Sequence, residues 1–408
     1  MKRKLRHHLI IVGAAALGSL GFLALGRARE AVKFRDSEIG KRKDAAGDVH
    51  YAKLALAGDA VDRGFYDPSI AYAPDGRTGW LAYSSVTGAG NLVGGKFALG
   101  QYVSTHLART VDGGATWTFV KAVNASTDGT LIMSDGAELK GVWRYEVSSL
   151  VCDAADPDAA RRWKLFVHRY FWEPKRDRMF THGWIALRTT ADPAGAWSEE
   201  VPLFGAGKNP PVPYHTTLID LNTLDSSLKD TVVYSEPGVL ADGARLCLSL
   251  SAVRPRLSLT GVKLEYRIIL LASDDHGATW RFVRTLLDPE DAARFGCEMF
   301  DGSSLARENG RFFLLVTPGH QGAMHDGTVA FAFESFAEGK LRRDANGQPI
   351  VAAYFAPQPG IFSGPGAGQA TYDSHNIHGG LILPQFNLRA YPEAFQLYQT
   401  GRRIVEKE

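Results

Sequence analysis

The sequence has few cysteines and no marked excess of charge. Its 408 residues include three widely spaced cysteines, Cys152, Cys247 and Cys297. Three such residues allow at most one disulfide and match no zinc-ligand spacing, so we expect buried free thiols. The formal net charge is +2, and beyond residue 30 the chain has 40 basic and 43 acidic residues. A body this close to neutrality gives no electrostatic reason to expect a nucleic acid partner.

Several common catalytic motifs and long helices are also missing. The sequence contains no Gly-x-Ser-x-Gly, no phosphate-binding loop and no dinucleotide fingerprint, which removes the best-marked classes of hydrolase and nucleotide enzyme. No long amphipathic helix is apparent, and residues 288–295 are the one short helix that we predict. From Asp48 onward, short apolar runs alternate with turn signals among 43 glycines and 19 prolines. This pattern predicts an all-β protein.

The N-terminus has the pattern of a targeting segment. Four basic residues lie within the first six positions, and no charge occurs between Leu9 and Gly26. We predict that residues 1–30 are a signal peptide or an N-terminal membrane anchor, because the apolar run is as long as a short spanning helix. Either alternative exports the rest of the chain to the periplasm or the outside. Residues 31–47 are charged and predict a linker, which leaves residues 48–408 as one domain.

One eight-residue pattern occurs twice. Residues 110–117 and 273–280 both follow Ser/Thr-x-Asp-x-Gly-x-Thr-Trp, and each comes directly after a β-like run. The aspartate and the hydroxyl side chain can accept or donate hydrogen bonds within a turn, and glycine supplies a positive φ. The pattern resembles the Asp-box of the sialidase and BNR-repeat families. That resemblance implies a β-propeller in which the box closes the hairpin between the third and fourth strands of a blade, away from the active site. A degenerate third copy lies at residues 190–197.

A weaker repeat marks the start of each predicted blade. An ionisable residue is followed by one or two small residues and an apolar run at five places: Asp67, Glu146, Glu236, Asp301 and His378. We therefore predict a five-bladed β-propeller with blades at residues 62–124, 140–203, 228–287, 296–345 and 370–400. Residues 50–57 are expected to supply the outer strand that closes the ring with blade five. A six-bladed propeller, as in sialidases, is the second choice.

The repeat also predicts a site. The first strand of each blade of a propeller lines the central channel, so these ionisable side chains are expected to converge at one mouth. Carboxyl groups held close together raise one another's pKa, and hydrolysis of a glycosidic bond needs one protonated and one ionised carboxyl group. Each residue also has a structural alternative: Asp67 and Asp301 suit turns, and Glu146 could pair with an arginine.

The blade openings resemble five-bladed glycosidases of the arabinanase/β-xylosidase and invertase type. The resemblance implies that Asp67 is the general base or nucleophile and that Glu236 is the acid. Glu146 lies where those families have a supporting aspartate, and Asp301 is a further candidate. His378 resembles a histidine that lies beside a central calcium in some arabinanases. No cofactor is required by this mechanism, and calcium is left open.

The neighbours of Glu146 suggest how a carbohydrate could be bound. We predict substrate contacts from Trp143, Arg144, Tyr145, Trp172 and His378, because sugar faces stack on aromatic rings and arginine recognises carboxylates. The function that we predict is therefore an exported glycoside hydrolase, in contact with the membrane only through its N-terminal segment. One alternative is a non-catalytic propeller that binds a glycan or an envelope protein. A second alternative is an exo-sialidase, although the Phe/Tyr-Arg-Ile-Pro motif of that family is absent.

Overall fold

The computed structural model describes most of the predicted domain. The described residues are 33–46, 49–88, 92–93, 96–97, 101–133, 135–173, 182–206, 217–258, 261–320, 324–358, 368–376 and 378–404. The predicted signal or anchor segment lies outside these ranges, so it stays a prediction. Within the ranges, no helix has the length and the apolar composition that crossing a membrane would need.

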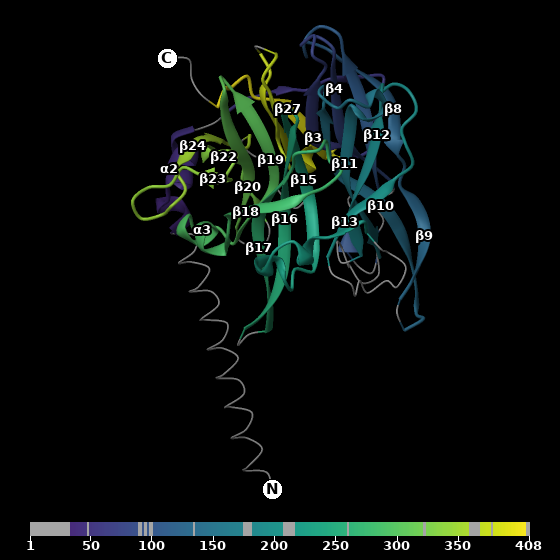
Figure 1. The fold of residues 1–408 in the computed structure, drawn as a ribbon. Coiled ribbons are helices and arrows are strands. Elements are labelled where there is room, and N and C mark those ends of the chain that lie inside the picture. The colour runs from purple at the N-terminus through teal and green to yellow at the C-terminus, as the bar shows by residue number, and fades with distance from the viewer. Residues whose placement is uncertain are drawn as a thin grey trace, which may run out of the picture.

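The described strands form antiparallel meanders around a common centre (Figure 1). Blade one contains β3 (Gly64–Tyr72), β4 (Gly79–Thr87), β7 (Tyr102–Thr110) and β8 (Trp117–Asn124), with the small hairpin β5 (Leu92–Val93) and β6 (Lys96–Phe97) inserted. Blade two contains β10 (Glu138–Cys152), β11 (Trp163–Trp172), β12 (Gly183–Thr190) and β13 (Val201–Gly205), extended by β9 (Thr127–Ile132) and β14 (Ile219–Asp220). Blade three contains β15 (Val233–Asp242), β16 (Arg245–Ser258), β17 (Gly261–Ser273) and β18 (Arg281–Leu287).

The last two meanders complete the ring. Blade four contains β19 (Met299–Glu308), β20 (Arg311–His320), β22 (Thr328–Ser335) and β24 (Val351–Phe355), with short strands β21 (Met324–His325) and β23 (Lys340–Leu341). Blade five contains β25 (Thr371–Asp373), β26 (Gly380–Phe386), β27 (Phe395–Gln399) and the N-terminal β1 (Ala52–Lys53). The pairing of β1 with β27 closes the ring, as predicted for residues 50–57, and β2 (Leu56–Ala57) continues onto β8 of blade one. The predicted all-β propeller is confirmed. Blade four extends beyond the predicted residue 345, because the short strand β23 pairs with β22 before the fourth strand β24 begins.

The inner strands β3, β10, β15, β19 and β25 contact one another in sequence around the channel. Small residues make this close approach possible, because their hydroxyls reach across to the neighbouring blade. The hydrogen bonds between neighbouring blades include Leu150 N to Ser69 Oγ (2.9 Å), Val239 N to Ser149 Oγ (2.9 Å), Ser304 Oγ to Ala370 O (2.6 Å) and Ile70 N to Thr371 Oγ1 (3.3 Å). The small residues of the sequence repeat therefore join the blades.

Both eight-residue motifs form the predicted turns between third and fourth strands. In the first, Asp112 accepts hydrogen bonds from the hydroxyls of Thr110 and Thr116 and from the Thr116 backbone. Asp275 accepts the same three bonds in the second turn. These bonds lower the pKa of both aspartates to about 2. Trp280 then packs edge-on against Phe166 and Phe204 of blade two, so the second motif also joins two blades.

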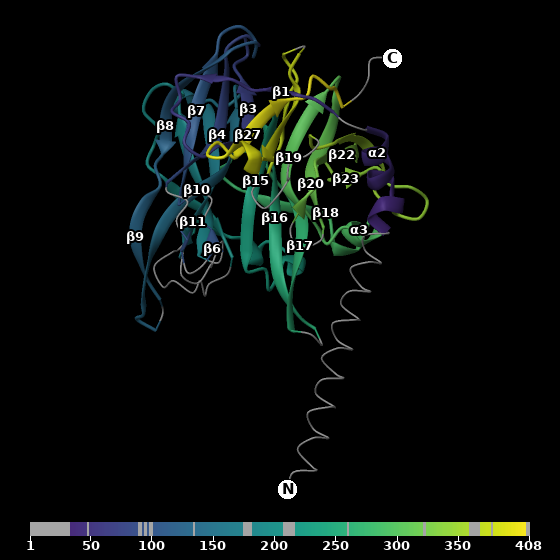
Figure 2. The same cartoon turned by 180° about the vertical axis from the view of Figure 1, so that it is seen from behind.

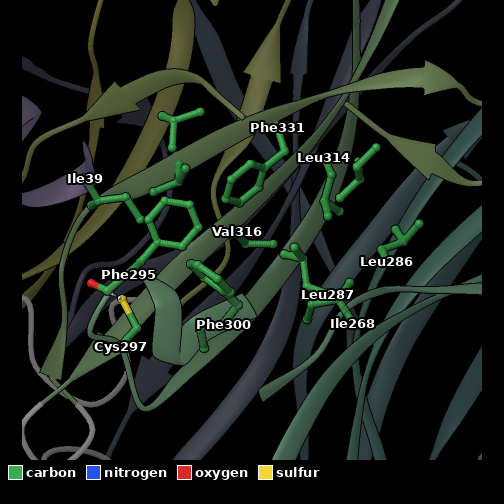
Figure 3. Packing of buried hydrophobic residues seen from close by; sticks show 14 of the residues in the cluster. Ile39, Ile268, Leu286, Leu287, Phe295, Cys297, Phe300, Leu314, Val316 and Phe331 are labelled. Carbon is green, nitrogen blue, oxygen red and sulfur yellow. Dashed lines mark hydrogen bonds between the residues drawn. The ribbon is translucent and has the colours of Figure 1, made fainter. Parts of the chain in front are cut away.

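The predicted linker is partly a helix that packs on the propeller, which corrects the prediction for residues 31–47. Helix α2 (Glu38–Ala46) follows Phe34, and both Phe34 and Ile39 are buried in the core between blades three and four. Figure 3 shows Ile39 beside Phe295 and Phe331. Only these few apolar positions contact the core, which is why the charged sequence shows no clear periodicity.

The short helix expected at residues 288–295 is present as α3 (Pro289–Arg294). Asp288 and Asp291 form a capping box at its N-terminus. Short 3-10 turns lie at Ala159–Arg161, Leu221–Thr223, Ser226–Leu228 and Leu388–Ala390. All three cysteines are free, and burial raises the pKa of the Cys247 thiol to about 12.

Candidate active site

Each of the first four inner strands is interrupted by a β-bulge at the predicted site. The ladder register shifts at Tyr66/Ser69, Glu146/Ser148, Ser235/Gly238 and Asp301/Ser304. The bulge residue has a positive φ in every case: Asp67 48°, Val147 53°, Glu236 55° and Gly302 57°. A left-handed backbone costs a non-glycine residue about 1–2 kcal/mol, and such strain concentrates at functional sites. The bulges also correct the predicted alignment of the blade openings. Asp67 and Glu236 are themselves bulge residues, whereas Glu146 and Asp301 each lie one residue before the bulge residue of their own strand.

Asp67 is buried at the centre of the ring. Its Oδ1 accepts a hydrogen bond from the backbone N–H of Gln369 at 2.9 Å, and its Oδ2 lies 3.4 Å from the Ser84 hydroxyl. Burial raises the pKa of Asp67 well above its usual range, and the charges of Glu146 and Asp301 raise it further. Gly368 makes room for this carboxyl group, because a Cβ at that position would lie 1.9 Å from Asp67 Oδ1.

Two tyrosines hold Glu146. The hydroxyl of Tyr66 donates to Oε1, and the hydroxyl of Tyr170 donates to Oε2. Burial raises the pKa of both phenols, and the charge of Glu146 raises it further, so both remain donors. The alternative that Glu146 is neutralised by its neighbour Arg144 is wrong, because that guanidinium contacts the Tyr170 hydroxyl (3.4 Å) and the Gln101 carbonyl (2.9 Å).

Glu236 and Asp301 share one hydroxyl group. The Oγ of Ser251 lies 2.8 Å from Glu236 Oε2 and 2.7 Å from Asp301 Oδ1. A hydroxyl has one hydrogen to donate, so both contacts are hydrogen bonds only when one of the carboxyl groups is protonated. Burial raises the pKa of Glu236 well above its usual range, and the charge of Asp301 raises it further. The raised pKa favours the proton on Glu236, although the Gly302 N–H, which donates to its Oε2 at 2.6 Å, opposes that shift.

None of the four carboxyl groups forms an ion pair with a lysine or arginine among the described residues. Elsewhere in the same structure, buried carboxylates are matched by cations, as Asp153 is by Lys164 at 2.9 Å. Four uncompensated carboxyl groups in one place are costly, since like charges oppose one another's ionisation. The raised pKa values of Asp67 and Glu236 favour their protonated forms, so the site is suited to acid/base chemistry.

Two of the five predicted sugar-binding residues, Arg144 and Trp172, lie beside Glu146. Arg144 is buried, and its guanidinium lies 3.9 Å from the centre of the Trp172 ring. Alternate residues of a strand point to opposite faces, so Trp143 and Tyr145 lie on the other face of β10. There both rings surround the guanidinium of Arg169 at 4.9 and 5.2 Å. Their predicted substrate contact is wrong, because strand alternation directs them into the blade.

His378 is at the wrong end of the channel for its predicted role. It follows Asn376, whose side chain donates to the Gly114 carbonyl in the first eight-residue turn motif, opposite the mouth. The inner strand of blade five is β25 (Thr371–Asp373), so residues 378–382 lie at the start of the second strand instead. Blade five meets the site through Gly368 and Gln369, which offer no ionisable side chain.

Three residues of the site were not predicted. Ser251 lies on the second strand of blade three, and Gln369 links Asp67 to blade three through a bond from its Nε2 to the Pro237 carbonyl (3.2 Å). Burial lowers the pKa of His325 while the charge of Asp301 opposes that shift, and its Nδ1 has no hydrogen-bond partner among the described residues. The sequence offered no signal for Ser251 or Gln369, because their roles depend on contacts with distant strands.

One cluster among the described residues brings possible metal ligands together. Asp153, Asp156 and His276 bring one donor atom each within 4.8 Å of the others. The ammonium group of Lys164 already lies among them, 2.9 Å from Asp153 and 2.7 Å from Asp156. A buried lysine in this position supplies the positive charge that a cation would supply, so the cluster is a structural ion pair network.

The arginine clamp of a sialidase is not assembled among the described residues. Arg109 lies over Trp80, Arg169 pairs with Glu200, and Arg267 donates to the Ser227 carbonyl. These guanidinium groups have separate partners in different blades, so they do not converge on one carboxylate.

No protein-family model matches the chain, and no curated protein sequence matches it. Similar solved structures include the catalytic domain of the family GH62 α-L-arabinofuranosidase of Coprinopsis cinerea, with 10% identity, 86% of this chain and 96% of that chain covered, and a TM-score of 0.47. A family 117 glycoside hydrolase of Zobellia galactanivorans is 10% identical, with 88% and 92% covered and a TM-score of 0.49. An α-L-arabinanase of Cellvibrio cellulosa in complex with arabinohexaose is 10% identical, with 70% and 76% covered and a TM-score of 0.39. These values are too low to assign a function by likeness.

Proposed function

We propose that this protein is an exported glycoside hydrolase whose active site is the cluster of carboxyl groups at the centre of the propeller. The observation that supports the proposal best is the pair Glu236 and Asp301, which shares the Ser251 hydroxyl and has no ion-paired lysine or arginine among the described residues. Such a pair favours a protonated Glu236, which supplies the acid that the hydrolysis of a glycosidic bond requires.

Glu236 is the proposed general acid. Its raised pKa keeps a proton available near neutral pH, and Asp301 is the neighbour that maintains the shift. Gln369 bonds to Asp67 with its backbone and to the residue after Glu236 with its side chain, so Asp67 lies across from the acid. Asp67 is therefore the proposed base or nucleophile.

The raised pKa of Asp67 opposes the ionised form that this role needs, so its proton must pass to solvent before the reaction. The transition state of glycoside hydrolysis carries positive charge on the sugar ring. A cationic ring beside Asp67 and Glu146 would offset the repulsion between the two ionised carboxylates. In this proposal Glu146, held by Tyr66 and Tyr170, supports the developing charge without touching the leaving group.

One observation favours a non-catalytic alternative. The Asp67 side chain is only 1% exposed in the free protein, as a purely structural carboxyl group would be. The alternative is a glycan-binding propeller, and it predicts binding that survives neutralisation of the carboxyl groups.

The test is a hydrolysis screen of the full-length protein on aryl glycosides and plant and microbial polysaccharides. Asp67→Asn and Glu236→Gln are compared with the matched changes Asp75→Asn and Glu298→Gln, which alter exposed carboxylates outside the cluster. Turnover that the first two variants lose by at least about a thousandfold and the matched variants keep supports the proposal. Sugar binding without turnover, unchanged in all variants, supports the glycan-binding alternative.

Export is proposed from the basic and apolar N-terminal sequence. Cell fractionation of the full-length protein tests this part separately, since a cytoplasmic protein would contradict export without affecting the chemistry.

A further inference from the structure

The hairpin between β16 and β17 extends beyond the propeller on the side of the candidate active site. The last pairing of β16 with the inner strand is Val253↔Val233, whereas β16 and β17 stay paired with each other as far as Ser258↔Gly261. The free part of the hairpin therefore projects by about five residues, or about 17 Å. Figures 1 and 2 show it at the same end of the molecule as the hairpin of β9 and β10.

One face of this hairpin is apolar and exposed. Paired residues of an antiparallel ladder point to the same side. The pairs Leu257↔Val262 and Pro255↔Leu264 therefore share a face. Leu257 is 87% exposed, Val262 64% and Leu264 50%. Aliphatic side chains that gather at one exposed place usually mark an interaction site.

The opposite face of the hairpin is basic. Arg254 and Arg256 both bind Glu265, at 2.8 and 2.9 Å, and Lys263 pairs with Arg256 in the ladder. Three cations against one carboxylate leave a net positive charge beside the apolar face. The occupant that fits this combination has an apolar interior and an anionic surface, as a phospholipid bilayer does. A sugar would instead favour aromatic rings, which the apolar face lacks.

The start of the described chain lies at the same end of the propeller. Residues 33 and 34 pack against Gly296, where a Cβ would lie 2.2 Å from the Phe34 backbone nitrogen. Gly296 comes three residues before β19, the strand that begins at the active-site end and contains Asp301. The uncharged sequence from Leu9 to Gly26 ends only a few residues earlier, and six residues span at most about 20 Å. A membrane anchor formed by that sequence, as predicted above, would bring the active-site end of the propeller close to the lipid.

We propose that the apolar face of the β16–β17 hairpin, formed by Pro255, Leu257, Val262 and Leu264, inserts into the surface of an anionic phospholipid membrane. The propeller is then held with its active-site end toward the lipid. This inference depends on the hairpin and on the N-terminal sequence, and it is independent of the chemistry proposed above.

The experiment uses the full-length protein in vesicles of phosphatidylglycerol and phosphatidylethanolamine. An environment-sensitive dye is attached to a single added cysteine at Leu257 in a Cys152→Ser background, since Cys247 and Cys297 are buried. The matched control carries the dye at Val111, which is 58% exposed in the Asp-box turn at the opposite end of blade one. Lipids brominated in their acyl chains quench a dye that enters the bilayer.

Insertion predicts a blue shift and at least severalfold stronger quenching at position 257 than at position 111. Arg256→Glu combined with Lys263→Glu is expected to reduce the quenching at 257, and so are vesicles of zwitterionic lipid alone. Equal quenching at the two positions overturns the proposal. A blue shift in detergent that rises with protein concentration also overturns it, because the face would then bind a second copy of the chain.

Discussion

Replacing the proposed acid Glu236 by glutamine is expected to stabilise the folded protein at neutral pH. The wild-type protein must either ionise Glu236 next to Asp301 or bind a proton there, and no cation offsets the cost. Two unit charges about 5 Å apart in a medium of effective dielectric about 20 repel each other by about 3 kcal/mol. Glutamine removes this repulsion, but part of the resulting gain in stability is lost because the amide must rearrange its hydrogen bonds. We therefore expect Glu236→Gln to raise the free energy of unfolding by about 1–2 kcal/mol at pH 7.5, as other active-site neutralisations do.

The sign of the pH dependence follows from the raised pKa. A carboxyl group whose pKa is higher in the folded state stabilises the fold fully below its unfolded pKa, near 4.5. That stabilisation is lost as the pH rises toward the folded pKa. Glutamine does not titrate, so the advantage of the variant should be absent near pH 4 and grow between about pH 5 and pH 8.

Urea unfolding followed by tryptophan fluorescence measures this difference at both pH values. Glu298→Gln is the matched control, because Glu298 is exposed at the start of the same blade as Asp301, and its effect should stay within about 0.5 kcal/mol. An advantage of Glu236→Gln that is equal at pH 4 and pH 7.5 would refute the reasoning. A destabilised variant would show that the ionised carboxylate, held by Gly302 and Ser251, is the favoured form.

Three further predictions concern other parts of the molecule. Gly368→Ala places a methyl group 1.9 Å from Asp67 Oδ1 and should lower hydrolysis about a hundredfold. The control is Gly243→Ala, at a glycine that also has a positive φ but faces open space. This control should keep activity, and each variant should lose about 1 kcal/mol of stability. Equal activity of the two variants would contradict a catalytic role of Asp67. Asp275→Asn should flatten the fall in urea midpoint between pH 5 and pH 3, because the pKa of Asp275 is lowered to about 2 and its stabilisation is lost as pH falls; an unchanged slope would contradict this. Ile39→Ala should cost about 2–4 kcal/mol in urea unfolding, and a loss below about 0.5 kcal/mol would mean that α2 contributes little.

The sequence predicted those features that depend on neighbouring residues. The two eight-residue turns were evident because each turn is closed by its own threonine, serine and aspartate side chains. The bulges at Asp67 and Glu236 were marked by an ionisable residue before proline, and proline donates no ladder hydrogen bond. Small residues follow each bulge because the inner strands lie close together around a narrow channel.

Other predictions failed where a local pattern had two structural solutions. Asn376–Ile382 has the composition of a blade opening, yet the turn at its start places it after the inner strand and moves His378 to the other end. The charged segment before residue 47 contains few apolar residues, and only its docking on blade four makes residues 38–46 a helix. Trp143 and Arg144 are adjacent in the sequence, and only the pleat of β10 decided which of them lies beside Glu146.

The sequence by itself determined that this chain is an all-β propeller with carboxyl groups at the starts of its blades. These features are set by turn chemistry and by strand periodicity, which act over a few residues. Only the tertiary structure decided which carboxyl groups contact the same hydroxyl group. Ser251 lies 50 residues before Asp301, and Gln369 lies 302 residues after Asp67. Such contacts form when the ring closes, because burial and the fields of distant charges exist only in the folded chain.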